Sequence, residues 1–240
     1  MDINKNCKLF LRGVYLYDIS SCHYVILEKL GFDISKIDKD DKEKRNTQIG
    51  LAIRDNPRLG SMLRSITTST IDEYLKENNI SENDIILRQY DGILLIKRLT
   101  ITKGHIPLDL QKFFDMFIIS IDRSCYLGFT SDSITIKGIS RRYQKMDEVY
   151  RKLSRINYNS KESVFKGLEE VKRLIFNTDD IMLFCIESDV DKYSVFLKQY
   201  GEIEVSKSTA KLLDMNEIDR QKYFDFYLKP FTMSVCKEFL

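Results

Sequence analysis

An apolar run that ends on a carboxylate is the strongest constraint on how this chain folds. Residues 14–17 favour a β-strand, Asp18 follows at once, and Ser20 or Ser21 then offers the cap of a helix that Gly31 ends. This arrangement places the carboxylate at the end of a strand. There an aspartate either caps the following helix or holds a ligand. Asp18 alone leaves both interpretations open.

A second acid stands at the end of another β-prone run. Residues 85–89 and 93–97 predict the two strands of a tight hairpin with Asp91 at its tip, where Gly92 supplies the unusual backbone angles of the turn. Taken singly, Asp91 is explained equally well as a turn former. Two carboxylates on neighbouring strand ends, however, are the minimum for a pair of divalent ions, which activate an attacking oxygen and steady a leaving one.

Composition narrows the class of protein. A chain of 240 residues has room for one large domain or two small ones, and a net charge of +2 means that any nucleic-acid contact must be local. The five cysteines never show CxxC spacing, which argues against a disulfide framework and a zinc site and favours a reducing compartment. No apolar run is long enough to span a membrane, and the polar start lacks a signal peptide. We therefore expect a soluble, cytoplasmic protein.

Hydrophobic periodicity predicts a mixed first part and a helical last part, with a domain change near residues 142 and 143. A short helix with one basic face begins at Lys42 and is broken by Pro57 and Gly60. Residues 110–117 suit a helix or a loop. The other predicted helices are 61–77, 143–156, 160–176, 189–200 and 217–227; the other predicted strands are 117–121, 126–129 and 134–136, and 181–186 suits a strand or a buried helix.

The order strand, acid, helix, basic helix, strand, acid, glycine, strand is that of the catalytic palm in template-directed polymerases. Six short motifs, from about residue 13 to the C-terminus, resemble those of family B DNA polymerases in the order of that family. They are 18–23 (motif A), 42–50 (motif B), 90–92 (motif C), 122–126 (the basic-Tyr motif), 136–142 (the Lys-Gly and Arg-Arg entry to the thumb) and 223–230 (the aromatic-to-Pro stretch of the thumb).

The resemblance implies an α+β fold and an enzyme. Residues 1–142 would form a palm, an antiparallel sheet with helices on one face, with a short helical fingers insertion at about 34–60; residues 143–240 would form a mostly helical thumb. The implied activity is template-directed DNA synthesis by two-metal nucleotidyl transfer, with primer–template DNA and dNTPs as substrates.

By the same resemblance, Asp18 and Asp91 would be the catalytic carboxylates and hold two Mg²⁺ ions. Five residues would contact the nucleotide: Lys42, Arg45, Asn46, Ser21 and His23. Five would contact the primer–template duplex: Arg54, Tyr126, Lys137, Arg141 and Arg142. Phosphate contacts of this kind are sequence-blind and salt-sensitive. The alternative is a solvated charged surface for the basic residues and a core position for Tyr126.

The chain departs from the family pattern at four places. His23 stands where the family has a sugar-selecting tyrosine, Tyr24 replaces its proline, and Ile49 replaces an aromatic residue of motif B. Gln89 takes the place of the first of two motif C acids.

About a dozen residues precede the first palm strand, so we expect no exonuclease here and either a minimal polymerase or one subunit of a split, phage-like enzyme whose second chain carries the N-terminal and exonuclease portion. Two other functions remain. One is an inactive polymerase relative that binds primer–template DNA or scaffolds a replication complex. The other is a reverse transcriptase or primase-like polymerase, which the 136–142 segment disfavours.

Overall fold

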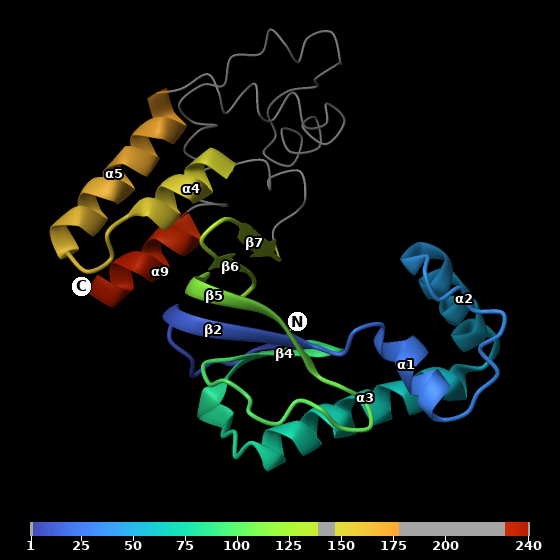
Figure 1. Cartoon of the computed structure of the whole chain (residues 1–240). Coiled ribbons are helices and arrows are strands. Elements are labelled where there is room, and N and C mark those ends of the chain that lie inside the picture. The colour runs from blue at the N-terminus through green and yellow to red at the C-terminus, as the bar shows by residue number, and fades with distance from the viewer. Residues whose placement is uncertain (1, 139–146, 178–228, 240) are drawn as a thin grey trace, which may run out of the picture. The chain divides into compact units, whose positions relative to one another are not determined.

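The computed structural model describes residues 2–138, 147–177 and 229–239 and has an α+β fold (Figure 1). This confirms the predicted fold class. The predicted elements at 181–186, 189–200 and 217–227 lie outside the described residues, as do Arg141 and Arg142. No helix in the described ranges has both the length and the apolar character needed to cross a membrane.

Seven strands lie in the order β1-β3-β4-β2-β5-β6-β7. The pairs β1–β3, β3–β4, β4–β2, β5–β6 and β6–β7 are antiparallel. Their bounds are β1 Asp2–Ile3, β2 Phe10–Asp18, β3 Ile85–Arg88, β4 Gly92–Leu95, β5 Asp109–Ile119, β6 Tyr126–Phe129 and β7 Ile134–Lys137. The predicted β3–β4 hairpin with Asp91 in its turn is therefore present.

The chain divides into two compact units, and two strands belong to both. Unit 1 holds residues 1–7 and 12–114, and unit 2 holds 8–11 and 115–240. The division crosses β2 between Leu11 and Arg12 and β5 between Phe114 and Asp115. It does not fall near residue 142, and the palm and thumb boundary stays a prediction.

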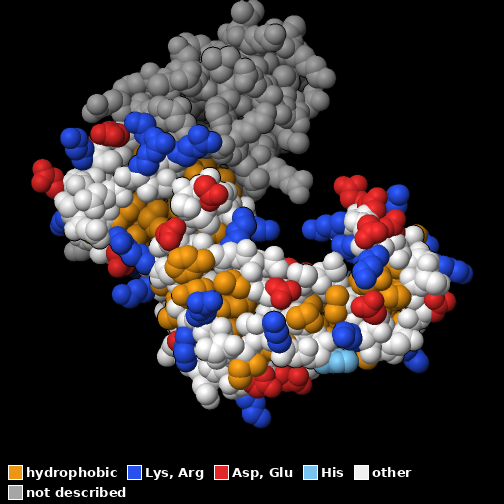
Figure 2. Space-filling model, in the orientation of Figure 1, with side chains coloured by type: hydrophobic (Ala, Val, Ile, Leu, Met, Phe, Trp, Pro, Cys, Tyr) orange, Lys and Arg blue, Asp and Glu red, His pale blue; other side chains and the backbone are white. Residues whose placement is uncertain are grey.

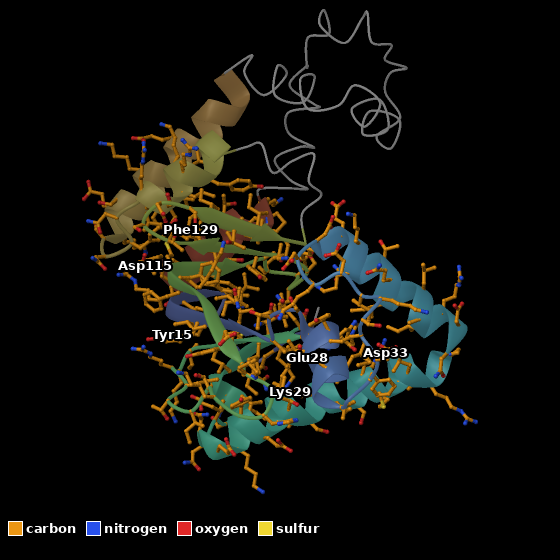
Figure 3. The ribbon with its side chains drawn as sticks, turned by 45° about the vertical axis from the view of Figure 1, so that its right-hand side comes forward. Tyr15, Glu28, Lys29, Asp33, Asp115 and Phe129 are labelled. Atoms are coloured by element: carbon orange, nitrogen blue, oxygen red, sulfur yellow. The ribbon has the colours of Figure 1, made fainter. Side chains whose placement is uncertain are left out.

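Unit 1 packs helices against one sheet face. The helices are α1 (Cys22–Lys29), α2 (Lys42–Asp55) and α3 (Pro57–Glu77), followed by the 3₁₀ turn η1 (Glu82–Asp84). Figure 3 labels Glu28 and Lys29 at the end of α1 and Asp33 in the connection towards α2. Tyr17 from β2 and Ile19 just after it, Ile93 and Leu95 from β4, and Leu63 and Ile71 from α3 share one buried core. The strand alternation thus matches the apolar stripe of α3.

The break predicted at Pro57 is confirmed, because α2 ends at Asp55 and Pro57 is the first residue of α3, where the missing N–H costs nothing because that position has no intrahelical partner. Two other sequence predictions about these elements were wrong. Gly60 lies inside α3, where a Cβ would come within 2.8 Å of Ile53 Cγ2 on α2. Residues 110–117 are neither helix nor loop but part of the eleven-residue strand β5.

Among its described residues, unit 2 contains the second part of β5, β6, β7 and three helices. They are α4 (Asp147–Arg155), α5 (Lys161–Asn177) and α9 (Lys229–Phe239). Helices α4 and α5 agree with two predicted helices. The rings of Phe10, Tyr158 and Phe239 contact one another in its core. On the visible face, lysine and arginine side chains are interspersed with acidic ones, as a net charge of +2 leads one to expect (Figure 2).

The end of α3 is fixed by a buried asparagine that organises the loop after β4. Asn78 Nδ2 donates to the carbonyls of Tyr74 and Ile101 at 2.8 and 2.9 Å. Its Oδ1 accepts from the backbone N–H groups of Thr100 and Ile101 at 2.7 and 2.9 Å. One side chain therefore bonds four backbone groups; three belong to the loop at Thr100 and Ile101, and the fourth, the Tyr74 carbonyl, also accepts from the Asn78 N–H at 3.0 Å.

We predict that Asn78→Ala lowers the free energy of unfolding by about 2 to 4 kcal/mol, because several buried backbone groups lose their partner. Chemical denaturation followed by circular dichroism measures the change. The matched control is Lys76→Ala on the same helix, whose side chain is exposed and which we expect to change stability by less than about 0.5 kcal/mol. Equal stabilities of Asn78→Ala and the parent would contradict this role.

Candidate functional site

Unit 1 contains a pocket of about 610 Å³ at the end of β2. It brings together both predicted catalytic carboxylates and all five predicted nucleotide contacts: Asp18, Asp91, Ser21, His23, Lys42, Arg45 and Asn46. The rest of its wall comes from residues on the same elements and from one residue of β5: Ile19, Ser20, Cys22, Tyr24, Ile49, Gly50, Ile53, Tyr90 and Gln111. Residues up to 93 positions apart in sequence therefore face one cavity.

Backbone hydrogen bonds tie the end of β2 to the turn that carries Asp91. Asp18 ends β2, and its Cα lies opposite that of Gly92. The Ile19 N–H donates to the Asp91 carbonyl at 2.8 Å, while the Gln89 N–H donates to the Gly92 carbonyl at 2.9 Å and closes the turn. The end of one strand is thus fastened to the turn that precedes the next. Helix α1 begins after Ser21, which makes no side-chain capping bond.

Gly92 is required for a reason other than the one its sequence position indicated. We expected it to supply unusual backbone angles, but the glycines with positive φ among the described residues are Gly13, Gly31 and Gly138. A Cβ at Gly92 would instead lie 2.7 Å from the Tyr17 carbonyl oxygen and 2.9 Å from Asp18 Oδ1. Both distances are too short for a real contact. The Asp18 carboxylate occupies the space that a side chain at position 92 would need.

Helix α2 contributes one face to the pocket. Lys42, Arg45, Asn46, Ile49 and Ile53 recur at spacings of three and four, which puts them on one side of a helix. The Asp41 carboxylate caps this helix by accepting from the Glu43 and Lys44 N–H groups.

Arg45 is buried, and its Nη1 donates to the Lys39 carbonyl at 2.6 Å. It therefore holds the connection before α2 while its guanidinium lines the pocket. Lys42 and Asn46, by contrast, are exposed at the pocket wall.

A histidine and a tyrosine form the opposite side of the pocket. His23 Nε2 and the Tyr90 hydroxyl are 2.8 Å apart, and the two rings meet edge-on with centroids 5.3 Å apart. Burial lowers the pKa of His23, although the Asp91 carboxylate opposes this shift. The guanidinium carbon of Arg64 lies 5.7 Å from the centre of the Tyr90 ring. The position that departs from the family pattern thus acquires a definite partner.

Sequence reasoning missed three residues of this neighbourhood. Tyr90 was noted within a motif but given no role, and Arg64 and Gln111 were given none. Gln111 Nε2 donates to Ser20 Oγ at 3.0 Å across 91 positions, and His23 meets Tyr90 across 67. No local pattern predicts such long-range pairs. The first five residues of β5 are all exposed, so no alternation marked Gln111 as a strand residue.

Cys22 lies beneath the pocket and links α1 to α3. Its Sγ is 3.2 Å from Thr67 Oγ1, which itself donates to the Leu63 carbonyl at 2.8 Å, so the thiol is the donor. Burial, with smaller contributions from Asp91 and Asp18, raises the pKa of the thiol to about 11. Both carboxylates therefore lie close enough to this thiol to act on it electrostatically.

We predict that Cys22 resists alkylation in the native protein. At pH 8, three units below a pKa of about 11, roughly one thiol in a thousand is ionised, and only the thiolate reacts. Iodoacetamide labelling mapped by mass spectrometry measures the rate at each cysteine. Partly exposed Cys7 serves as the internal control. Labelling of Cys22 as fast as Cys7 would show that α1 does not bury this thiol.

The donor set suits Mg²⁺. This ion is commonly bound by one or two carboxylates, with waters and substrate phosphates completing its shell. Asp18 and Asp91 supply two hard oxygen ligands in one pocket. Within residues 2–138, 147–177 and 229–239, no group of three or more His, Cys, Asp or Glu side chains converges as a metal cluster. A metal here would thus rely on substrate oxygens as well as on the chain.

The predicted DNA contacts are not gathered in this pocket. Arg54 is exposed on α2 and pairs with its neighbour Asp55 at 3.2 Å. Tyr126 is fully buried, with its ring 4.6 Å from that of Phe117, which corrects the prediction of a DNA contact in favour of the core position. Lys137 is exposed at the end of β7. Arg141 and Arg142 lie outside the described residues.

Comparison of the chain with protein-family models, with curated proteins and with solved structures gave no match. The functional argument therefore rests on the motifs and on the geometry of the pocket.

Proposed function

We propose that this chain is the palm and thumb portion of a family B-like DNA polymerase that extends a primer by two-metal nucleotidyl transfer. One observation carries the proposal. The two strand-end carboxylates and the basic face of α2, predicted separately from distant motifs, line one pocket of about 610 Å³. That volume lies in the usual range for a small-molecule or cofactor site. The sheet would be the palm, α2 and its connection the fingers, and residues from 143 onward the thumb.

In this proposal Asp18 and Asp91 hold two Mg²⁺ ions, which supply charge stabilisation and an activated 3′-hydroxyl when bound. The hydrogen bond from the Ile19 N–H to the Asp91 carbonyl holds the backbones that carry the two acids next to each other. Such preorganisation is valuable because the acids need not reorient as charge develops. The role of the chain here is to hold two oxygen ligands at a fixed place.

Lys42 and Arg45 face the carboxylates across the pocket and supply the positive charge that a triphosphate requires. Arg45 is the more rigid of the two because it is buried and tied to the Lys39 carbonyl. Asn46, one turn beyond Lys42, adds a neutral donor and acceptor at the exposed rim. Ser21 and the His23–Tyr90 pair close the side of the pocket next to the acids.

A catalytically inactive relative that binds primer–template DNA is the second candidate. It is favoured by Gln89, which stands where the family has the first acid of motif C and lies in the turn that closes the hairpin. In either case we propose that the chain has a partner, a second chain that carries the exonuclease portion. The two candidates share the DNA surface and differ in chemistry.

We predict that Asp18→Asn and Asp91→Asn each reduce Mg²⁺-dependent primer extension by several orders of magnitude, because a neutral amide no longer supports metal-held charge stabilisation. Gel analysis of a labelled primer on a short template measures the rate, with the chain alone and with its second subunit once known. Asp109→Asn, an exposed carboxylate outside the pocket at the start of β5, is the matched control and should keep full activity.

Extension that survives either pocket substitution would refute the metal assignment. No extension by the parent chain, together with duplex binding, would favour the inactive relative.

We further predict that Gly92→Ala abolishes extension while the protein still folds. The new methyl group would displace the Asp18 carboxylate, which lies 2.9 Å from its position. Extension and circular dichroism are measured on the same preparation. Gly50→Ala is the control, since a Cβ there meets nothing within 4 Å although the residue lines the pocket. A fully active Gly92→Ala protein would show that the geometry of Asp18 does not matter.

A further inference from the structure

One face of α3 has a composition that neither the core nor the pocket explains. Residues 56–71 contain no acid, although acids make up 36 of the 240 residues. After Asn56 and Pro57, which are also exposed, the exposed side chains of this stretch are all arginine or small hydroxyl residues: Arg58, Ser61, Arg64, Ser65, Thr68 and Ser69. We call these six residues the α3 polar face. They occupy adjoining positions on the helix surface at spacings of three, four and seven.

The α3 polar face is separate from the packing of the helix. Leu59, Leu63 and Ile71 are buried on the opposite side. The acids begin at Asp72, and that carboxylate is held by Arg88 at 2.8 Å. An ordinary solvated helix mixes both signs of charge, with acidic and basic residues paired at i and i+4. Sixteen successive residues with cations, hydroxyls and no acid instead favour a surface for a polyanion.

The spacing of the two arginines suits a nucleic-acid strand. Arg58 and Arg64 are six residues apart, which is about 9 Å along a helix axis at 1.5 Å per residue. Three or four successive phosphates of one strand span about 7 to 10 Å, at about 3.4 Å axial rise each. The side chains between them are short, so a sugar–phosphate backbone can come close and accept hydrogen bonds from the hydroxyls.

An exposed aromatic ring lies beside this face. Tyr90 is 40% exposed, and its ring is next to the Arg64 guanidinium at 5.7 Å and held at its hydroxyl by His23. Cationic tracks with a stacking ring are how proteins bind single strands without sequence preference, whereas a base in a duplex is not free to stack on a protein ring. The combination distinguishes an unpaired strand from a double helix.

We propose that the α3 polar face and Tyr90 bind single-stranded nucleic acid, with phosphates along Arg58 and Arg64 and a base on the Tyr90 ring. The assignment of that strand as the unpaired part of a template rests on the proposed polymerase function. The binding itself does not, because it needs neither metal nor nucleotide. Because Tyr90 precedes Asp91 in the hairpin turn, the bound strand would run past the turn at the edge of the pocket.

The test uses the full chain and a fluorescent 20-nucleotide single strand of mixed sequence, without metal, in an anisotropy titration at several salt concentrations. Arg58→Gln with Arg64→Gln should weaken binding by about tenfold or more and reduce the salt slope by about 1.4, since each phosphate contact to a single strand contributes about 0.7. Lys76→Gln with Lys103→Gln, which removes the same charge from exposed sites, is the control and should leave both unchanged.

Tyr90→Leu should weaken binding about tenfold with an unchanged slope, because it removes stacking and no charge. Tyr90→Phe, which keeps the ring but loses the hydroxyl contact with His23, should lose less binding than Tyr90→Leu. An unchanged slope in the double arginine variant, or an equal effect of that variant on a blunt duplex, would overturn the assignment. If the arginine and Tyr90→Leu variants lose single-strand binding but the parent chain never extends a primer, the binding surface is supported and the proposed synthesis is refuted. The two failures are therefore distinguishable.

Discussion

One backbone hydrogen bond between the end of β2 and the β3–β4 turn underlies the whole site. The Ile19 N–H reaches the Asp91 carbonyl at 2.8 Å, and Gly92 leaves room beside Asp18 that any other residue would fill. Strand end and hairpin turn are thereby held at one distance. Both acids line one pocket, and like charges in one pocket repel each other unless cations balance them. Lys42 and Arg45 of α2 line the same pocket. The site is therefore an arrangement of charge that a backbone contact makes possible.

Hydrogen bonds between neutral groups support the pocket residues, and those of Cys22 and Thr67 join helices α1 and α3. Cys22 donates to Thr67, Thr67 donates to the Leu63 carbonyl, and Tyr17 accepts from the Leu99 N–H at 2.8 Å. None of these groups is charged at neutral pH, and burial raises the pKa of Cys22 and of Tyr17. Neutral hydrogen bonds fix position without adding charge to the neighbourhood of the acids. The ionised groups are thus confined to the pocket wall.

The sequence was informative where a pattern is local. Asp18 at a strand end, Asp91 in a turn and the basic face of α2 were all predicted, because a strand, a tight turn and a helix face each have a short-range signature. The reason given for Gly92 was wrong, because the close approach of β2 cannot be read from residues 89–93. Strand β5 was missed, since its exposed first half does not alternate. Tyr90 and His23 meet across 67 positions, which no period encodes.

Strands β2 and β5 each run through the boundary between the two compact units. A domain joined by a linker can be removed, exchanged or duplicated without disturbing its neighbour. Here a cut at either boundary would divide a strand and expose its backbone groups. Separating the two units would therefore break both β2 and β5.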